Sequence, residues 1–297
     1  MLEKVNCPLC GEDDCSVLYH RPYALGAMSD CAATTDQFAT YGRIVRCIKC
    51  GMVYTNPRPA REALLAGYGS CVDDAYLQES SSRSINAHLS LNVIKRFAHS
   101  GRLLEIGSAT GYFLNAARAD FDAVGLEPSE WACKIARERF KLEVYAEPIE
   151  TDRFPRGSFD VVAMTDVIEH LIDPKDALRR AADWLKPGGL LYVVTPDVSS
   201  LSALLLRGFW WGLRPAHIHY FDRETLRRML KEAGFEVRLE KSFGRMFSYG
   251  YWLSRLRNYP RLVYRSVEAA IEGLDIKEKL LYLDTRDSME VCARKAA

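Results

Sequence analysis

The sequence predicts an α/β protein with a doubly wound, mainly parallel sheet, preceded by a small cysteine-rich segment. From residue 101 onward, apolar strand-like runs alternate with helical patterns. Such alternation is typical of strands joined by crossover helices. Before that point, two cysteine pairs of identical spacing occur within 50 residues. We therefore expect one large layered domain and one small domain.

Composition sets the outer limits of function. The chain has 297 residues, 48% of them hydrophobic and 27% charged, with a formal net charge of +1. This near-neutral charge argues against a nucleic-acid partner. No apolar run reaches the roughly 18–20 residues of a membrane span, and "MLEKVNCPLC" does not resemble a signal peptide. The nine cysteines do not form a disulfide framework, so we expect a cytoplasmic protein.

The N-terminal segment predicts a zinc ribbon over residues 1–60. "CPLCG" at 7–11 and "CIKCG" at 47–51 are matching knuckles, in which a glycine permits the tight turn after each cysteine pair. Four thiolates form the tetrahedral site that structural zinc prefers. We expect these ligands to be Cys7, Cys10, Cys47 and Cys50, with Cys15 and Cys31 as spare candidates. A closed site of this kind is structural, since no position is open for chemistry.

The remaining elements follow in order. Residues 61–100 are predicted as a helical connector with a polar break at "QESSSRS". The large domain spans 101–297. Its expected strands lie near 102–107, 122–127, 142–146, 159–165, 189–195, 235–243 and 288–294. Its expected helices include 129–140, 175–186 and 222–233. "LKPGG" at 185–189 is predicted as a helix stop and turn, and 244–282 as a helical, aromatic insertion.

The stretch "LLEIGSATGYFL" at 103–114 predicts a strand, a tight turn and a helix start. It lacks the Lys-Ser/Thr of a triphosphate loop and the glycine spacing of a dinucleotide fingerprint. Small residues let a ligand lie against the backbone, here at Gly107, Ala109 and Gly111. Glu105 would repel phosphate, so we expect a ligand with a cationic group or hydroxyls.

A second acid-tipped strand, "DAVGLEPS", ends at Glu127. A carboxylate there can accept both hydroxyls of a ribose. Two such strands around a Gly-rich turn resemble the class I S-adenosylmethionine-dependent methyltransferases. Their first motif is usually acid-x-G-x-G-x-G, and Ala109 replaces the middle glycine. The replacement adds one methyl group, a mild departure unless the position requires a positive φ.

Further motifs carry the same resemblance over about 101–243 and 286–297. "FPRGSFDVVAMTDVIEHLIDP", "LKPGGLLYVVTP" and "HIHYFDRETLRRMLKEAGFEV" resemble the family's fourth, fifth and sixth strand regions. The resemblance implies a Rossmann-like methyltransferase sheet with an antiparallel last strand. It also implies a cofactor site, with the methionine ammonium near Glu105 and the ribose on Glu127 and Pro128. The expected lining residues are Glu105, Gly107, Ala109, Gly111, Glu127, Pro128, Thr165 and Asp166.

One stretch departs from the family pattern. Family members often carry an acid after the third strand, facing adenine. Here the stretch reads "YAEPIET", which brings Pro148 near that position. Backbone groups around residues 147–149 are the alternative for holding adenine.

Histidines mark the expected reaction centre. A neutral histidine can take a proton from a hydroxyl acceptor, and we expect His170 and His217 to fill this role. "DVIEH" resembles a segment of ubiquinone-pathway O-methyltransferases and small-RNA 3′-end methyltransferases. That resemblance implies a divalent ion at Asp166, Glu169, His170 and His217. The alternative is that Glu169 and His170 only orient the loop.

Two later stretches are candidates for acceptor binding. Trp210, Trp211 and His219 lie where this family builds acceptor lids, and the tryptophans could stack on a ring or pack in the core. Residues 244–265 carry five arginines and no acid, interleaved with aromatic residues. Such a segment fits an anionic acceptor, a peripheral membrane contact through 245–265, or a solvated insert.

The combined reading is a methyltransferase that acts at oxygen on a small molecule or saccharide, such as a glycan, quinone-like or natural-product acceptor. The alternative is an RNA methyltransferase that uses the zinc ribbon to bind its substrate. A catalytically silent scaffold is a third reading, disfavoured by the intact acids at 105 and 127.

Overall fold

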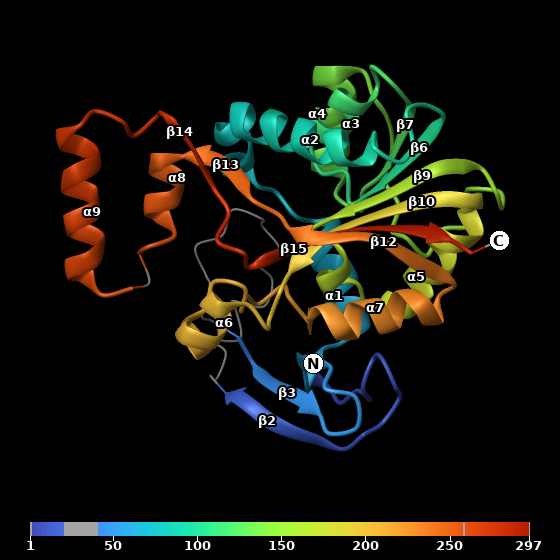
Figure 1. The fold of residues 1–297 in the computed structure, drawn as a ribbon, viewed down its shortest axis with the longest axis horizontal. Coiled ribbons are helices and arrows are strands. Elements are labelled where there is room, and N and C mark those ends of the chain that lie inside the picture. The colour runs from blue at the N-terminus through green and yellow to red at the C-terminus, as the bar shows by residue number, and fades with distance from the viewer. Residues whose placement is uncertain (1, 21–40, 258, 297) are drawn as a thin grey trace.

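The large domain is built on a seven-stranded mixed sheet (Figure 1), as the sequence predicts. The computed structural model describes residues 2–20, 41–257 and 259–296. The strand order is β12-β15-β10-β9-β6-β7-β8, and β15 runs antiparallel to both neighbours. The bounds are β6 Arg102–Ile106, β7 Asp122–Leu126, β8 Glu143–Tyr145, β9 Phe159–Thr165, β10 Leu185–Pro196, β12 Phe235–Ser242 and β15 Ser288–Lys295.

Helices cover both faces of this sheet (Figure 1). One hydrophobic cluster contains residues of α2 (Ser80–Ile94), α3 (Tyr112–Ala117) and α4 (Glu130–Phe140). A second, on the other face, contains residues of α5 (Pro174–Trp184) and α7 (Arg223–Glu232). Side-chain caps start α5 and α7: Asp173 accepts from the Asp176 amide at the start of α5, and Asp222 forms a capping box with Thr225 at the start of α7.

Two local expectations fail. "LKPGG" follows the end of α5 at Trp184, as a helix stop should, but it is not a turn before the strand, because β10 already begins at Leu185 and pairs irregularly between Leu185 and Leu190. The serine run at 80–82 does not break a helix, because it starts α2. The break lies earlier, between α1 (Arg61–Gly69) and the 3₁₀ turn η2 (Asp74–Glu79), where the Asp73 side chain caps Tyr76.

The N-terminal segment forms a second, antiparallel sheet in the order β11-β4-β3-β2. Its strands are β2 Cys15–His20, β3 Arg43–Cys47, β4 Val53–Thr55 and β11 His219–Tyr220. The fourth strand, β11, comes from the loop before α7. A separate two-stranded sheet pairs β1 (Leu2–Glu3), which precedes β2, with β5 (Arg58–Pro59), which follows β4. Cys31 and the rest of 21–40 lie outside the described residues.

The segment 244–282 folds as a hairpin with two helices rather than as helices alone. β13 (Arg245–Ser248) pairs with β14 (Leu280–Leu283), and α8 (Tyr249–Ser254) and α9 (Arg261–Gly273) lie between them. In Figure 1 this arm extends to one side of the sheet. The short elements η3 (Ile168–His170), α6 (Leu201–Leu206) and η4 (Arg207–Phe209) follow β9 and β10.

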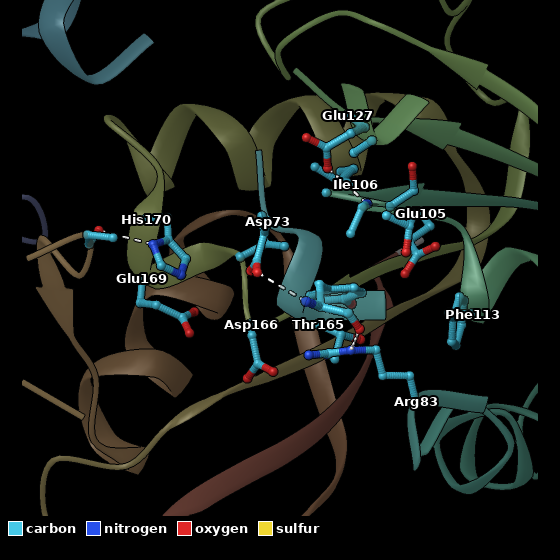
Figure 2. Close-up of a pocket in the computed structure, with 18 of the residues that line it drawn as sticks. Asp73, Arg83, Glu105, Ile106, Phe113, Glu127, Thr165, Asp166, Glu169 and His170 are labelled. Carbon is cyan, nitrogen blue, oxygen red and sulfur yellow. Dashed lines mark hydrogen bonds between the residues drawn. The ribbon is translucent and has the colours of Figure 1, made fainter. Parts of the chain in front are cut away.

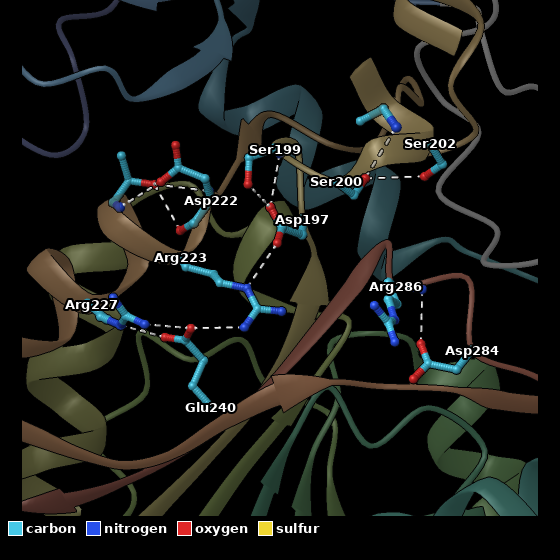
Figure 3. Close-up of polar contacts among 12 residues, drawn as sticks. Asp197, Ser199, Ser200, Ser202, Asp222, Arg223, Arg227, Glu240, Asp284 and Arg286 are labelled. Carbon is cyan, nitrogen blue, oxygen red and sulfur yellow. Dashed lines mark hydrogen bonds and ion pairs between the residues drawn. The ribbon is translucent and has the colours of Figure 1, made fainter. Parts of the chain in front are cut away.

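Polar contacts tie the loops after β10 to α7 and β12 (Figure 3). Arg223 bridges Asp197 and Glu240, at 3.4 and 3.2 Å, and Arg227 also pairs with Glu240. Because Asp197 and Glu240 are largely buried, these ion pairs fix the loop that leads toward residues 210–221. No helix among the described residues is both long and apolar enough to cross a membrane.

Candidate functional site

The loop after β6 is shaped by three residues in the left-handed region of the backbone. Gly107, Ala109 and Gly111 have φ values of 70°, 45° and 85°. A Cβ at Gly107 would lie 2.5 Å from Val167, and one at Gly111 would lie 2.6 Å from Leu142. The Ala109 replacement is therefore not a mild departure, because an L-residue is strained at positive φ.

Glu127 holds this loop from the end of β7. One carboxylate oxygen accepts the Ala109 amide at 2.9 Å, and the other accepts the Ser129 amide at 2.8 Å. Burial raises the pKa of Glu127, although these two amides oppose the shift. The carboxylate thus faces the loop that the sequence predicts as its partner in cofactor binding.

Unsatisfied polar atoms surround the loop. Glu105 is 5% exposed, and burial together with the nearby Glu127 raises its pKa well above the usual range. One Glu105 oxygen and the hydroxyls of Ser108 and Thr110 are buried with no hydrogen-bond partner among the described residues. Unpaired buried polar groups cost stability, so a ligand with an ammonium group and hydroxyls fits this end of the site. These residues therefore suit S-adenosylmethionine.

A single cavity of about 470 Å³ connects this loop to the histidine cluster. Figure 2 shows Glu105 and Glu127 on one side of the cavity, and Glu169 with His170 on the other. Seven of the eight expected cofactor-site residues contribute to its lining. The exception is Gly111, where Leu142 and Ala136 occupy the space beside the Cα atom. Pro148 and its neighbours Glu147 and Ile149 also line it.

His170 and His217 meet at the far end of the cavity. Their ring centroids are 4.6 Å apart at an interplanar angle of 83°. Nδ1 of His217 lies 2.8 Å from the Gly212 carbonyl, and Nδ1 of His170 lies 3.0 Å from the Ala216 carbonyl. A carbonyl only accepts, so each Nδ1 carries the proton and each Nε2 keeps its lone pair.

Burial keeps both rings neutral. It lowers the pKa of His170 to about 4, and the nearby Arg214 adds to this effect. It also lowers the pKa of His217 well below its usual value, together with His170 and Arg214. At neutral pH, each ring therefore presents a free lone pair rather than a positive charge.

Glu169 completes this cluster. It is 1% exposed, and one of its oxygens accepts from Thr195 at 2.9 Å. The other oxygen is buried without a partner among the described residues. Burial and the nearby Asp166 raise the pKa of Glu169 to about 8. One ligand atom from each of Glu169, His170 and His217 lies within 4.8 Å of the others, so the three side chains could hold a divalent ion.

Asp166 stands apart from that group. Its carboxylate forms an ion pair with Arg245 at 2.6 Å, and its own φ is 55°. Arg245 belongs to β13 in the inserted arm, so this ion pair joins the arm to the loop after β9. Asp166 lines the cavity but is not in the described three-residue cluster.

The model of the methyltransferase domain family matches residues 79–240. The chain belongs to this family. Over 197 residues it is 29% identical to a protein of Mycolicibacterium smegmatis described as a probable S-adenosylmethionine-dependent methyltransferase. This alignment covers 64% of this chain and 73% of the Mycolicibacterium protein. Over 157 residues it is 34% identical to the ubiquinone biosynthesis O-methyltransferase of Caulobacter vibrioides, covering 48% of this chain.

The chain spans only part of the length of some relatives. It covers 61% of the Caulobacter protein and 62% of the ubiquinone biosynthesis O-methyltransferase of Bordetella avium. A solved structure of an S-adenosylmethionine-dependent methyltransferase from Archaeoglobus fulgidus superposes with a TM-score of 0.51 at 23% identity, covering 75% of this chain and all of that one. That likeness concerns the fold.

The three acceptor candidates occupy different places in the methyltransferase. Trp211 lines the cavity and donates its indole N–H to Asp287. Trp210 is 1% exposed and packs in a separate cluster with Tyr41 and Leu213. His219 is also buried, with Nε2 2.9 Å from the Leu171 carbonyl, and neither residue is in the cavity lining. Both side chains are committed to packing.

Sequence reasoning missed part of the lining. Tyr68 of α1, Asp73 just before η2 and Arg83 of α2 come from a stretch that the sequence marks only as a connector. Arg83 stacks on Tyr76 at 3.2 Å from the ring centroid. Helical periodicity predicts these helices, but it does not reveal that the carboxyl edge of a distant sheet lies opposite them.

The cysteine knuckles come together as the spacing predicts. Cys7 and Cys50 Sγ atoms lie 3.4 Å apart, those of Cys10 and Cys47 lie 3.5 Å apart, and all four ligand atoms lie within 4.8 Å of one another. Gly11 and Gly51 both have a φ of 77°, as a tight knuckle turn requires. Four converging sulfurs fit structural zinc.

Proposed function

We propose that this protein transfers a methyl group from S-adenosylmethionine to an oxygen of a small, ring-bearing acceptor. One observation carries the proposal: a single cavity joins the Glu105–Glu127 end to the Glu169–His170–His217 cluster. Bound S-adenosylmethionine supplies an electrophilic methyl group. The chain must then align an acceptor oxygen with it and deal with the hydroxyl proton.

Alignment of the cofactor falls to the two acids and the loop between them. Glu105 offers an unpaired carboxylate oxygen to an ammonium group, and Glu127 offers its carboxylate to hydroxyls. Proximity and orientation supply a large share of the rate in a direct displacement. Thr165 and Asp166 follow β9 and border the space between the two ends.

His170 and His217 act on the acceptor's proton. Both rings are neutral near pH 7 and present Nε2, so either can accept a hydrogen bond from a hydroxyl. Their lowered pKa values make them weak bases. Proton transfer to these rings is therefore most favourable from a hydroxyl of low pKa, as in a phenol or catechol.

A divalent ion at the same cluster is the second candidate mechanism, and a specific arrangement favours it. Metal-binding histidines usually donate their second N–H to a carbonyl or carboxylate, as both rings do here. Glu169, His170 and His217 would hold the ion, which would lower the pKa of a bound hydroxyl. Burial favours the protonated form of Glu169, and a bound ion would favour its ionised form and give its buried, unpaired oxygen a partner.

Aromatic and cationic side chains support a ring-bearing, anionic acceptor. Trp211, Tyr251 and Trp252 line the cavity, and Arg245 and Arg255 also contribute to its lining. Of the roles considered for 245–265, we propose acceptor binding over membrane contact, because Phe247, Tyr251 and Trp252 of this segment line the cavity. Flat side chains stack on rings and sugar faces, and ubiquinone biosynthesis O-methyltransferases are among the relatives.

An RNA acceptor receives less support. The reactive cluster is deeply buried, with Glu169 at 1% and His217 at 4% exposure. A compact acceptor enters such a site more readily than a polymer does. The N-terminal sheet meets the catalytic loops through β11, which favours a structural role over substrate capture.

Binding and turnover test the proposal together. Calorimetry with S-adenosylhomocysteine should show micromolar-range affinity in the wild type and in His170→Ala. With a panel of catechols and sugar acids, including protocatechuate, His170→Ala and His217→Ala should each lower kcat by roughly 100- to 10,000-fold. An exposed-site control, His88→Ala, should match the wild type.

Chelation separates the two mechanisms. If an ion is required, EDTA should abolish turnover, Mg²⁺ or Mn²⁺ should restore it, and the cysteine-bound zinc should remain. If the imidazoles act alone, EDTA should have no effect. Near-normal turnover in both alanine variants would remove the histidines from the reaction, and failure to bind S-adenosylhomocysteine would refute the function itself.

A further inference from the structure

The strand that follows His217 is completed by the N-terminal sheet. β11 pairs antiparallel with β4, with His219 opposite Tyr54 and Tyr220 opposite Val53. The Thr55 amide donates to the Ile218 carbonyl at 3.0 Å, and the Thr55 hydroxyl donates to the His217 carbonyl at 3.3 Å. Thr55 is 1% exposed, so these bonds are shielded from water. The peptide that carries His217 is therefore anchored by the N-terminal segment.

The other histidine is held from α1, the helix that follows the N-terminal ribbon. The Tyr68 hydroxyl of α1 lies 3.0 Å from His170 Nδ1 and 3.3 Å from the Ala216 carbonyl. Because the hydroxyl donates to that carbonyl, it accepts from the Nδ1–H group. The two rings meet edge to face with centroids 6.0 Å apart. Tyr68 thus favours the tautomer that leaves Nε2 free.

The cysteine site is mechanically continuous with these contacts. The knuckle at 47–51 closes the β3–β4 turn, where the Cys47 amide donates to Met52 at 2.9 Å. Cys47, Met52 and Tyr54 belong to the same hydrophobic cluster as Ile168 and Phe221, which flank the two histidines in sequence. Packing at this density transmits small displacements. A change at the cysteine site therefore reaches the loops that carry His170 and His217.

We propose that the N-terminal ribbon and the adjoining helix α1 form a positioning device for the reaction centre, in which Thr55 of the ribbon positions His217 and Tyr68 of α1 positions His170. The metal-closed knuckle holds β4, β4 holds β11, and β11 sets the place of the His217 ring. The inference rests on the proposed role of the histidine pair. It assigns the ribbon to catalysis rather than to acceptor capture.

Imidazole NMR tests the transmission directly. The Thr55 hydroxyl donates to the backbone carbonyl of His217 and not to its ring, so a moved ring signal reports repositioning rather than the loss of a hydrogen bond to the ring. In protein labelled with ¹⁵N-histidine, Thr55→Val should shift the His217 and His170 signals, assigned with His→Gln variants. Thr55→Ser, which keeps the hydroxyl, should restore them. Ser16→Val, on the exposed far strand β2 of the same sheet, is the control and should change neither signal.

Hydrogen exchange gives a second readout. Thr55→Val should speed exchange in the peptide 214–222 by about five-fold, as expected for one lost hydrogen bond. Stripping the cysteine-bound metal should accelerate exchange in the same peptide, while the loop 105–111 keeps its protection. Affinity for S-adenosylhomocysteine should stay within two-fold of wild type in every variant, roughly the scatter of additive, independent sites.

The outcomes are separable. Unmoved ring signals and unchanged exchange at 214–222 after both Thr55→Val and metal removal would overturn the proposal. If Thr55→Val does not fold, Tyr68→Phe serves instead and should shift the His170 signal beyond that of His88. If His217→Ala retains turnover while Thr55→Val shifts the His217 ring signal, the proposed role of His217 in the reaction fails, but the positioning of His217 by Thr55 stands.

Discussion

Glu127 acts on the backbone before any ligand arrives. One of its oxygens accepts the amide of Ala109 in the loop after β6, and the other accepts the amide of Ser129, the N-cap residue of α4. A single carboxylate thereby fixes both the loop and the residue that caps the helix. Its loss should disturb cofactor binding through loop geometry as well as through the proposed contact with the ribose.

We predict that Glu127→Ala weakens S-adenosylhomocysteine binding by about 10- to 100-fold. Hydrogen bonds to a charged group contribute about 1.5–3 kcal/mol each, which corresponds to that range. Calorimetry measures the effect. Glu130→Ala, three residues along on the exposed first turn of α4, is the matched control and should bind normally. Equal affinity in the two variants would exclude Glu127 from the site.

His219 makes stability depend on pH. Burial lowers its pKa to about 3, with a contribution from Arg58, whereas an unfolded histidine titrates near 6.5. The folded state therefore keeps a neutral ring while the unfolded state gains a proton. Its contribution is full above pH 6.5 and declines as pH falls toward the folded value.

This shift predicts a loss of about 2 kcal/mol in unfolding free energy between pH 7 and pH 5 from this residue alone. His219→Gln keeps an N–H donor for the Leu171 carbonyl but does not titrate. Denaturant unfolding of both proteins at the two pH values isolates the difference, because other groups contribute equally. Parallel pH profiles would show that His219 is protonated in the folded protein.

Position along a strand predicts that Glu105 and Glu127 lie close together, and both line the same cavity. Glu105 and Glu127 end parallel strands, and such ends meet at one edge of the sheet. Sequence reasoning failed to separate Trp210 from Trp211, since adjacent side chains in an irregular loop point in unrelated directions. Tyr68 lies about 100 residues from His170 in sequence, and no local pattern reports such a contact.

At the scale of elements, the cofactor loop contains an unusual alanine. Ala109 adopts a φ of 45° and still donates its amide to Glu127. A left-handed alanine costs about 1 kcal/mol, and glycine would remove that strain. Glycine also adds freedom to the unfolded chain, at about 0.4–1 kcal/mol. The two effects nearly cancel.

Ala109→Gly should therefore leave stability unchanged or raise it by up to about 1 kcal/mol. Ala182→Gly, within helix α5, should instead lose about 1 kcal/mol. Denaturant midpoints measured side by side make the comparison. A clear loss at position 109, equal to that at 182, would mean that the loop does not strain its alanine.

Elements were predictable where periodicity was strong and less so at their ends. The seven core strands fall close to their expected ranges because buried strands, most of them parallel here, read as apolar runs. The serine run at 80–82 misled because serine favours caps as well as breaks. β11 is only two residues long, too short for any pattern to predict, yet it joins the two sheets.

At the scale of the whole molecule, one hydrophobic cluster runs from the cysteine knuckles to α5 and α7. Cys7, Leu9 and Met52 share it with Leu178 and Met229. The Lys175 ammonium also donates to the Leu9 carbonyl at 2.6 Å. The ribbon and the sheet should therefore unfold together, since neither has a core of its own on that side.

Metal removal tests this unity. We predict one zinc per chain by elemental analysis, and a single thermal transition that falls by about 10 °C when zinc is stripped, as a loss of several kcal/mol implies at this chain length. Cys50→Ser should behave like the stripped protein. Cys15→Ser, on β2 outside the four-sulfur cluster, should keep its zinc. Two separate transitions would contradict a shared core.

The pairing of β4 with β11 also sets an order of events during synthesis. Thr55 and His217 are 162 residues apart, so the knuckles leave the ribosome long before the strand that completes their sheet. At about 5–20 residues per second, the interval is roughly 8–30 seconds. During it, β4 presents an open edge and the apolar residues beside the knuckles lack their cover. The nascent chain must pass this interval with an unfinished ribbon, and early zinc capture would shorten its exposure to misassembly.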